Sequence, residues 1–404
     1  MMNSKKTVGI ICEYNPFHGG HRYQIEEMRK QGFDRVVCVM SGNTVQRGEF
    51  AIADKYTRAE TALEGGADLV LELPYPYSAS SAEFFALAGV RILENAGVDA
   101  ICFGSECGDV DKLKKAADVC DSEAFVEAYK NSISSGNGTA KAYFDAYKNV
   151  ANEELPGGAN DILGIAYLRA LKRENSNIEP IALKRRGSDY RNDSIEDLTE
   201  YPSATMLRNY ICENGINDKF ADIVPKETFA ALIKAAKSGR APVKMSNLDS
   251  AIIAHLRLFD ASKLEEIADV GGGLGERILS ASHKVTTYKE LVLLVSGKQY
   301  TEARVRRAIL NILTGVVFDD LKAYPAYTTV LGFNYNGREM LSELRKKEKN
   351  IAFITKPADA ESIGEKATRQ IYLDRRADAL FTLATPLKTD SGEYVRKFPI
   401  YIYN

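Results

Sequence analysis

The sequence predicts an α/β fold, with a doubly wound parallel sheet in the first half of the chain and an all-α region after it. Strand-like apolar runs alternate with helical patterns four times within about the first hundred residues, which is typical of a sheet with helices on both faces. From about residue 214 the patterns are helical throughout. A chain of 404 residues suits two or three domains, so we expect a catalytic domain at 1–213 and a helical region at 214–404.

The expected strands are continuous apolar runs, as in a parallel sheet that is buried on both faces. They lie at 7–12, 35–40, 68–73, 100–104 and 179–184. Helical patterns connect them at 20–31, 54–63, 82–95 and 161–172, and a helical insertion is expected at about 110–150. Ligands of doubly wound sheets bind at the carboxyl ends of the strands. The polar loops that follow the strands are therefore the expected site.

The most informative loop, Asn15 to His21, joins the first strand to the first helix. A helix N-terminus offers unpaired N–H groups to a phosphate, and glycines let the backbone approach it closely. His18 and His21 lie on one face of the first helical turn, so both rings can donate an N–H to one phosphate group. The alternative is a plain helix start with an exposed histidine, but two of the four histidines of the chain fall in this turn.

Three later segments also carry polar side chains at helix starts or strand ends. Asn160 opens a helix, and Arg185 and Arg186 follow the fifth strand. A helix cap and a surface basic patch are the alternative interpretations of these residues. The segment Pro202 to Arg208 places a Ser or Thr at a helix start and an arginine one turn later, a pattern suited to phosphate, although Ser203 could be a simple cap.

Composition excludes several classes of protein. Hydrophobic residues make up 45% of the chain and charged residues 27%, and no apolar run reaches the ~18 residues of a membrane span.

The six cysteines include no Cys-x-x-Cys pair, so we expect buried thiols in a reducing compartment and no metal site. The N-terminus runs directly into the first strand, which favours a cytoplasmic protein. A net charge of −2 argues against a strongly basic protein that coats nucleic acid, but it permits a local RNA-binding face.

The string His18-Gly19-Gly20-His21 resembles the HxGH motif of the nucleotidyltransferase superfamily related to class I aminoacyl-tRNA synthetases. Together with Met40-Ser41-Gly42-Asn43 and Gln46-Arg47-Gly48, the longer string from Glu13 to His21 is similar to one family in particular, the bacterial tRNA(Met) cytidine acetate ligases. The segment from Pro202 to Arg208 resembles the second superfamily motif, ISxTxxR, with Pro202 in place of Ile. The family usually has Asn where this chain has Gly19.

The resemblance implies a Rossmann-like fold and a two-step reaction. Acetate and ATP, with Mg²⁺, would form acetyl-adenylate, and the exocyclic amine of the wobble cytidine in elongator tRNA(Met) would then take the acetyl group. The catalytic residues would be His18 and His21. The ATP contacts would be Ile11, Cys12, Glu13, Tyr14, Asn15, Pro16, Phe17, Gly19, Gly20, Gly104, Asn160, Arg185, Arg186, Ser203, Thr205 and Arg208.

The expected partners are tRNA and acetate, with no membrane and no protein partner. Candidates for contact with substrate or tRNA are Ser41, Asn43, Gln46, Arg47, Arg304 and Arg307. Since a base must be splayed out to react, stacking side chains should line the site, and the candidates are Tyr14, Phe17, Tyr75 and Tyr77.

Two other functions share part of this pattern. An adenylyltransferase acting on a small phosphorylated metabolite would use the same histidine pair, but it would not need about 190 further residues. A non-catalytic module that binds nucleotide or RNA would not need both histidines and the arginine motif. Turnover of ATP distinguishes these functions.

Overall fold

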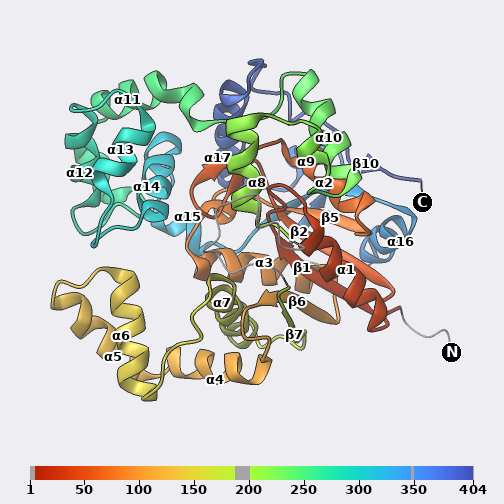
Figure 1. Cartoon of the computed structure of the whole chain (residues 1–404), viewed down its shortest axis with the longest axis horizontal. Helices are drawn as coiled ribbons and strands as arrows, with labels where there is room; N and C mark the ends of the chain where they lie inside the picture. The colour runs from red at the N-terminus through yellow and green to blue at the C-terminus, as the bar shows by residue number, and fades with distance from the viewer. Residues whose placement is uncertain (1–4, 187–200, 347–349, 404) are drawn as a thin grey trace.

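The computed structural model describes residues 5–186, 201–346 and 350–403, and it is organised around an eight-stranded, mostly parallel sheet (Figure 1). In spatial order the strands are β10 (Ile400–Tyr401), β8 (Tyr327–Phe333), β5 (Leu69–Leu73), β2 (Arg35–Ser41), β1 (Thr7–Cys12), β6 (Ala100–Ser105) and β7 (Glu179–Lys184), and β9 (Ala352–Ile354) pairs with β8. β2 pairs with one edge of β1 and β6 pairs with the other edge, so the order of the strands reverses direction at β1. This switch point is where a doubly wound sheet binds ligands, as predicted.

Helices cover both faces of the sheet because successive side chains of a strand point to opposite faces. Val8 and Ile10 of β1 share a core with α1 and α2, whereas Ile11 packs into a second core with α3 and α7. These helices are α1 (Gly19–Lys30), α2 (Lys55–Glu64), α3 (Ala82–Ala96) and α7 (Ala159–Arg173). The predicted insertion consists of α4 (Val110–Cys120), α5 (Glu123–Ser134) and α6 (Thr139–Ala151).

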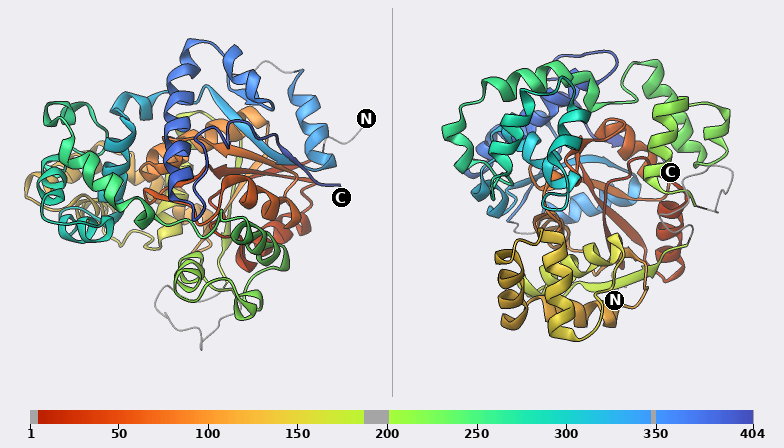
Figure 2. Two further views of the ribbon diagram at one scale, coloured as in Figure 1. Left: turned by 90° about the horizontal axis from the view of Figure 1, so that it is seen from above. Right: turned by 60° about the vertical axis from the view of Figure 1, so that its left-hand side comes forward.

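The region after residue 203 is mostly helical, and many of its helices gather beside one end of the sheet (Figure 2). They are α8 (Ala204–Asn214), α9 (Asp218–Ala221), α10 (Lys226–Lys237), α11 (Asp249–Leu258), α12 (Leu274–Ser282), α13 (Tyr288–Val295), α14 (Glu302–Thr314), α15 (Phe318–Lys322), α16 (Tyr335–Leu344) and α17 (Glu365–Ala384). Short 3₁₀ turns lie at Tyr77–Ala79, Met245–Leu248, Ala261–Glu266 and Pro357–Ser362. A small antiparallel hairpin, β3 (Thr44–Val45) and β4 (Glu49–Phe50), interrupts the loop after β2.

The expectation of helices throughout residues 214–404 needs one correction. Three strands, β8, β9 and β10, come from this region, and β8 pairs antiparallel with β5. The run that forms β8 is rich in β-branched and aromatic residues, which fit a pleated, buried surface. The run lies between the helical segments α15 and α16, so the pattern around it predicts a helix and not a strand. The C-terminal region therefore extends the sheet begun by the N-terminal region, and a functional division near residue 213 stays a prediction.

Gly337 provides a test of this sheet extension. It lies in the first turn of α16, where an added Cβ would meet the backbone carbonyl of Asp68, just before β5. We expect Gly337→Ala to lower the free energy of unfolding by about 1–3 kcal/mol, because backbone must move to make room. Gly297→Ala, whose Cβ would meet nothing within 4 Å, is the control. Urea denaturation measures both, and equal stability of the two variants would contradict the tight packing of α16 on the sheet.

Candidate active site

A cleft lies at the carboxyl ends of β1 and β6, where the N-termini of α1, α7 and α8 meet. It brings together segments that are almost 200 residues apart in the sequence. Seventeen of the predicted site residues line it: Ile11, Cys12, Glu13, Tyr14, Asn15, His18, Gly20, His21, Gln46, Arg47, Gly104, Asn160, Arg185, Arg186, Ser203, Thr205 and Arg208. The start of α8 suits a phosphate group of a ligand, whereas the first N–H groups of α7 are already capped by Glu106.

The two histidines form a reciprocal cap at the start of α1. Nδ1 of His18 accepts a hydrogen bond from the backbone N–H of Gly20 at 3.1 Å, and Nδ1 of His21 accepts one from the backbone N–H of His18 at 3.3 Å. The rings are stacked with centroids 3.7 Å apart. Since each Nδ1 is an acceptor, a neutral ring carries its proton on Nε2. The cap thus fixes both imidazoles as N–H donors at Nε2.

The surroundings favour the neutral form of both rings. Burial lowers the pKa of His18 to about 3, and the nearby charges of Arg185 and Arg208 add to this effect. Burial, His18 and Arg185 likewise hold the pKa of His21 well below its ordinary value. Near neutral pH the pair therefore offers two hydrogen-bond donors without charge, and the arginines supply the positive charge of the cleft.

Arg208 connects the second motif to the first. Its guanidinium donates to the carbonyl of Asn15 at 2.8 Å and to Oγ1 of Thr205 at 3.1 Å. Ser203 caps α8 by accepting the N–H of Met206 at 3.2 Å. The capping interpretation of Ser203 is thus correct, and it is compatible with phosphate binding, because Ser203, Ala204 and Thr205 line the cleft.

The start of α7 is held by a pair of carboxylates. Glu106 accepts hydrogen bonds from Nδ2 of Asn160 at 2.6 Å and from the backbone N–H of Asp161 at 2.8 Å. In return, Asp161 accepts the N–H of Glu106 at 3.0 Å. The Asn160 amide is therefore oriented with its oxygen toward Arg185, whose guanidinium lies 3.5 Å away. Glu106 is a supporting residue that no sequence motif marks as a ligand contact.

Several predicted site residues do not line the cleft. Phe17 is fully buried and packs beside Gly65 in the core. It therefore anchors the loop between β1 and α1 to the core and does not contact a ligand in the cleft. Pro16 precedes it in the same turn and is also buried. Gly19 lies beneath the ring of Tyr201, since a Cβ there would be 2.7 Å from Cδ1 of that ring. The absence of a side chain at position 19 thus makes room for Tyr201.

The candidates for substrate or tRNA contact divide into two groups. Gln46 and Arg47 line the cleft, whereas Ser41 and Asn43 are buried at the end of β2. Arg304 donates to the carbonyl of Gly271 at 2.7 Å, and Arg307 pairs with Asp269 at 3.1 Å. Both arginines lie on α14 and neither lines the cleft, so their contact with tRNA stays a prediction.

The predicted stacking residues also require correction. Tyr14, Phe17, Tyr75 and Tyr77 are each at most 1% exposed, because they belong to the hydrophobic cores. The partly exposed aromatic residues of the cleft are Tyr23 and Tyr201, which stack with ring centroids 6.0 Å apart. The Arg186 guanidinium lies 4.6 Å from the centroid of Tyr23. Tyr23 could have been found as the residue one helical turn after Gly19, but no local signal identified Tyr201.

This combination of a capped histidine pair, converging helix N-termini and a doubly wound sheet defines a nucleotidyltransferase site of the HIGH type. The HIGH Nucleotidyl Transferase family model matches residues 5–395. Relatives named tRNA(Met) cytidine acetate ligase, from Acetivibrio thermocellus and Caldanaerobacter subterraneus, are 37% and 40% identical, each covering 94% of this chain and 95% of the relative. The chain belongs to the tRNA(Met) cytidine acetate ligase family.

Solved structures agree with this assignment. The crystal structure of Thermotoga maritima TmcAL in an apo form matches with a TM-score of 0.92 and 28% identity, over 99% of this chain and 100% of that one. TmcAL bound with alpha-thio ATP matches with a TM-score of 0.90 over the same shares. The fold predicted from the sequence is thereby confirmed.

The pKa of His18 leads to a prediction about stability. In the unfolded chain this ring takes up a proton near pH 6.5, whereas in the folded protein it stays neutral down to about pH 3. The unfolded state therefore binds more protons in this window, and stability falls as the pH is lowered through it. Between pH 7 and 5 we expect the wild type to lose about 2 kcal/mol more than His18→Gln. Urea denaturation at both pH values measures this, and an equal loss in the two proteins would contradict a buried neutral His18.

Proposed function

We propose that this protein acetylates the wobble cytidine of elongator tRNA(Met), with acetate and ATP as the other substrates. The observation that carries the proposal is the stacked pair of His18 and His21 at the start of α1, where both Nδ1 atoms accept backbone N–H groups and leave Nε2–H as the donors. The named relatives and the TmcAL structure with an ATP analogue support the choice of substrates. In such a site catalysis depends on position and electrostatics, and the substrates provide the nucleophiles.

In the first step, an oxygen of acetate attacks the α-phosphorus of ATP. The bond from that phosphorus to the β-phosphate bridging oxygen breaks, pyrophosphate leaves, and acetyl-adenylate remains. Negative charge increases on the phosphate oxygens during the attack, and the two histidine donors can follow it without any change of protonation. The start of α8, together with Arg185 and Arg208, would hold the triphosphate.

In the second step, the exocyclic amine of the cytidine attacks the acetyl carbon. AMP leaves with the bonding electron pair, and the nitrogen loses a proton. The base has to reach the acetyl group beside the histidines, and the Tyr23 and Tyr201 rings line the same cleft. We therefore assign the stacking role to Tyr23 and Tyr201 in place of the four buried aromatic residues.

Mg²⁺ would enter with ATP and be held mainly by its phosphates, the usual arrangement for this ion. The cleft offers Glu13 as a nearby carboxylate, and in the described part of the chain no three acidic, histidine or cysteine side chains are grouped to hold a metal. The mainly helical region beyond residue 213 would provide the tRNA surface. None of the helices that the structure describes is long and apolar enough to cross a membrane. We place the reaction in the cytoplasm, where ATP and tRNA occur together.

Replacing His21 tests the first step. Loss of one transition-state donor typically costs about 3 kcal/mol, so His21→Ala should lower pyrophosphate release about a hundredfold or more. ATP affinity should change much less, because backbone N–H groups also hold the phosphates. Single-turnover assays with acetate measure the rate, and phosphorylated metabolites replace acetate as controls. Normal adenylation by the variant would contradict the role of His21, and turnover with only a phosphorylated metabolite would favour an adenylyltransferase.

Replacing Tyr201 tests the second step. Stacking of a base on an aromatic ring contributes about 1–3 kcal/mol, so Tyr201→Ala should raise the KM for tRNA about tenfold or more. Tyr201→Phe keeps the ring and should stay close to the wild type. Acetyl transfer to tRNA and pyrophosphate release without tRNA are measured in parallel. If Tyr201→Ala impairs only ATP-dependent pyrophosphate release, the ring supports the adenine instead of the cytidine.

A further inference from the structure

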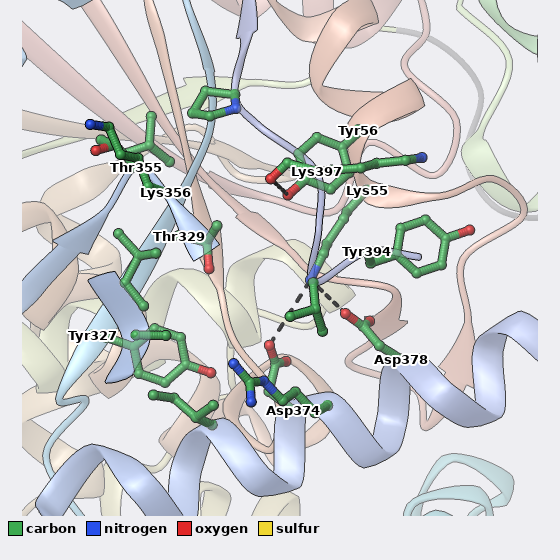
Figure 3. A pocket seen from close by; sticks show the side chains of 17 residues that line it. Lys55, Tyr56, Tyr327, Thr329, Thr355, Lys356, Asp374, Asp378, Tyr394 and Lys397 are labelled. Carbon is green, nitrogen blue, oxygen red and sulfur yellow. Dashed lines mark hydrogen bonds and ion pairs between the residues drawn. The ribbon is translucent and has the colours of Figure 1, made fainter. Parts of the chain in front are cut away.

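Four charged side chains form a buried ion cluster at the carboxyl end of β5: Lys55, Glu72, Asp374 and Asp378. The Lys55 ammonium lies 2.7 Å from Glu72, 2.8 Å from Asp378 and 4.0 Å from Asp374. Figure 3 shows both aspartates pointing from α17 toward the lysine. None of the four residues is more than 8% exposed. One lysine therefore joins α2 and β5 to a helix from the far end of the chain.

Such a cluster is not explained by stability alone. Removing charges from water costs several kcal/mol per ion, and an apolar replacement is often equally stable. Burial by itself lowers the pKa of Lys55, but the attraction of the three carboxylates outweighs it and holds the pKa well above its ordinary value. The lysine is therefore charged at neutral pH. Buried charges of this kind can instead specify one arrangement of the elements that carry them.

Asn43 connects the ion cluster to the β3–β4 hairpin. Its Nδ2 donates to Asp378 at 2.7 Å, and its Oδ1 accepts the backbone N–H of Lys55 at 2.8 Å. Its own carbonyl accepts the N–H of Ala51 at 2.9 Å, which closes the base of the hairpin. Asn43 is buried and does not line the cleft, so we assign it no ligand contact of its own. Its three hydrogen bonds fix where the hairpin leaves the sheet.

The tip of the same hairpin reaches the active-site cleft. The backbone N–H of Gln46 donates to Glu13 at 2.9 Å, and both Gln46 and Arg47 line the cleft. On the other side of the hairpin, Arg306 of α14 pairs with Glu49 at 2.9 Å. Two helices of the C-terminal region, α14 and α17, thus hold a hairpin whose tip faces the ATP site.

We propose that Asn43 and Asp378 are positioning residues for the ATP site, acting through the β3–β4 hairpin. The hydrogen bond between them sets the base of the hairpin, and the hairpin in turn places Gln46 and Arg47 in the cleft. The inference rests on the proposed function for its assay, and it assigns the buried Asn43 a role other than substrate contact.

A reciprocal exchange of the two residues tests this inference. In Asn43→Asp, two carboxylates face each other where a hydrogen bond was, so the hairpin base must move. In the double variant Asn43→Asp with Asp378→Asn, the new Asn donates to the new Asp, which still accepts the N–H of Lys55. We expect the KM for ATP to rise about tenfold in the single variant and to return to within about threefold of the wild type in the double variant.

A matched control lies at the opposite end of β5. Asn334 donates to Asp68 at 2.9 Å, so Asn334→Asp also places two carboxylates against each other. This pair lies at the other end of β5, far from the hairpin. Both single variants should lose thermal stability, and only Asn43→Asp should raise the KM for ATP in the pyrophosphate-release assay with acetate. If Asn43→Asp does not fold, Asn43→Ser, which is too short to reach Asp378, replaces it with the same expected direction.

Three results would overturn the inference. They are an unchanged KM for ATP in the Asn43 variants, an equal increase in Asn334→Asp, and a double variant no better than the single one. Each presupposes a wild type that releases pyrophosphate with acetate. A wild type that does not do so would instead contradict the proposed function, so the two failures are distinguishable.

Discussion

The buried guanidinium of Arg58 is the interaction on which the site depends most. At a switch point the strands end and the chain turns away, which leaves backbone carbonyls without partners in the sheet. Arg58 donates to the carbonyls of Glu13 at 2.6 Å, Ser41 at 3.1 Å and Gly42, and also to Ala53 at 3.0 Å. Burial lowers its pKa to about 10, so it is still charged at neutral pH. One side chain thereby holds the ends of β1 and β2 and the loops that follow them.

The loops held by Arg58 carry the two functional parts of the site. The loop after β1 contains the histidine cap, and the loop after β2 contains the β3–β4 hairpin. The two loops must keep a fixed position relative to each other and to the bound phosphates. A donor displaced by about 1 Å from a reacting phosphate loses much of its effect. The described residues already bring the two histidines together with Arg185, Arg186 and Arg208 in one cleft.

The sequence was sufficient for the fold of the first half and for most of the cleft. Continuous apolar runs and the glycine-rich turn are local signals, and β1 and β7 begin and end where they were predicted. Non-local features were missed. The β8 strand depends on a partner more than 250 residues earlier, and the packing of Tyr201 over Gly19 depends on a segment about 180 residues away. Likewise, Asn43 sits in a family motif, but its pairing with Asp378 is visible only in three dimensions.

The position of β8 also has a consequence for synthesis of the chain on the ribosome. Every residue of β5 is buried, yet the strand has no neighbour on one edge until residues 327–333 have emerged. An unpaired apolar edge is a template for pairing with other chains. During about 250 residues of elongation this edge of β5 therefore has no partner strand from β8, and such an edge favours aggregation until β8 pairs with it.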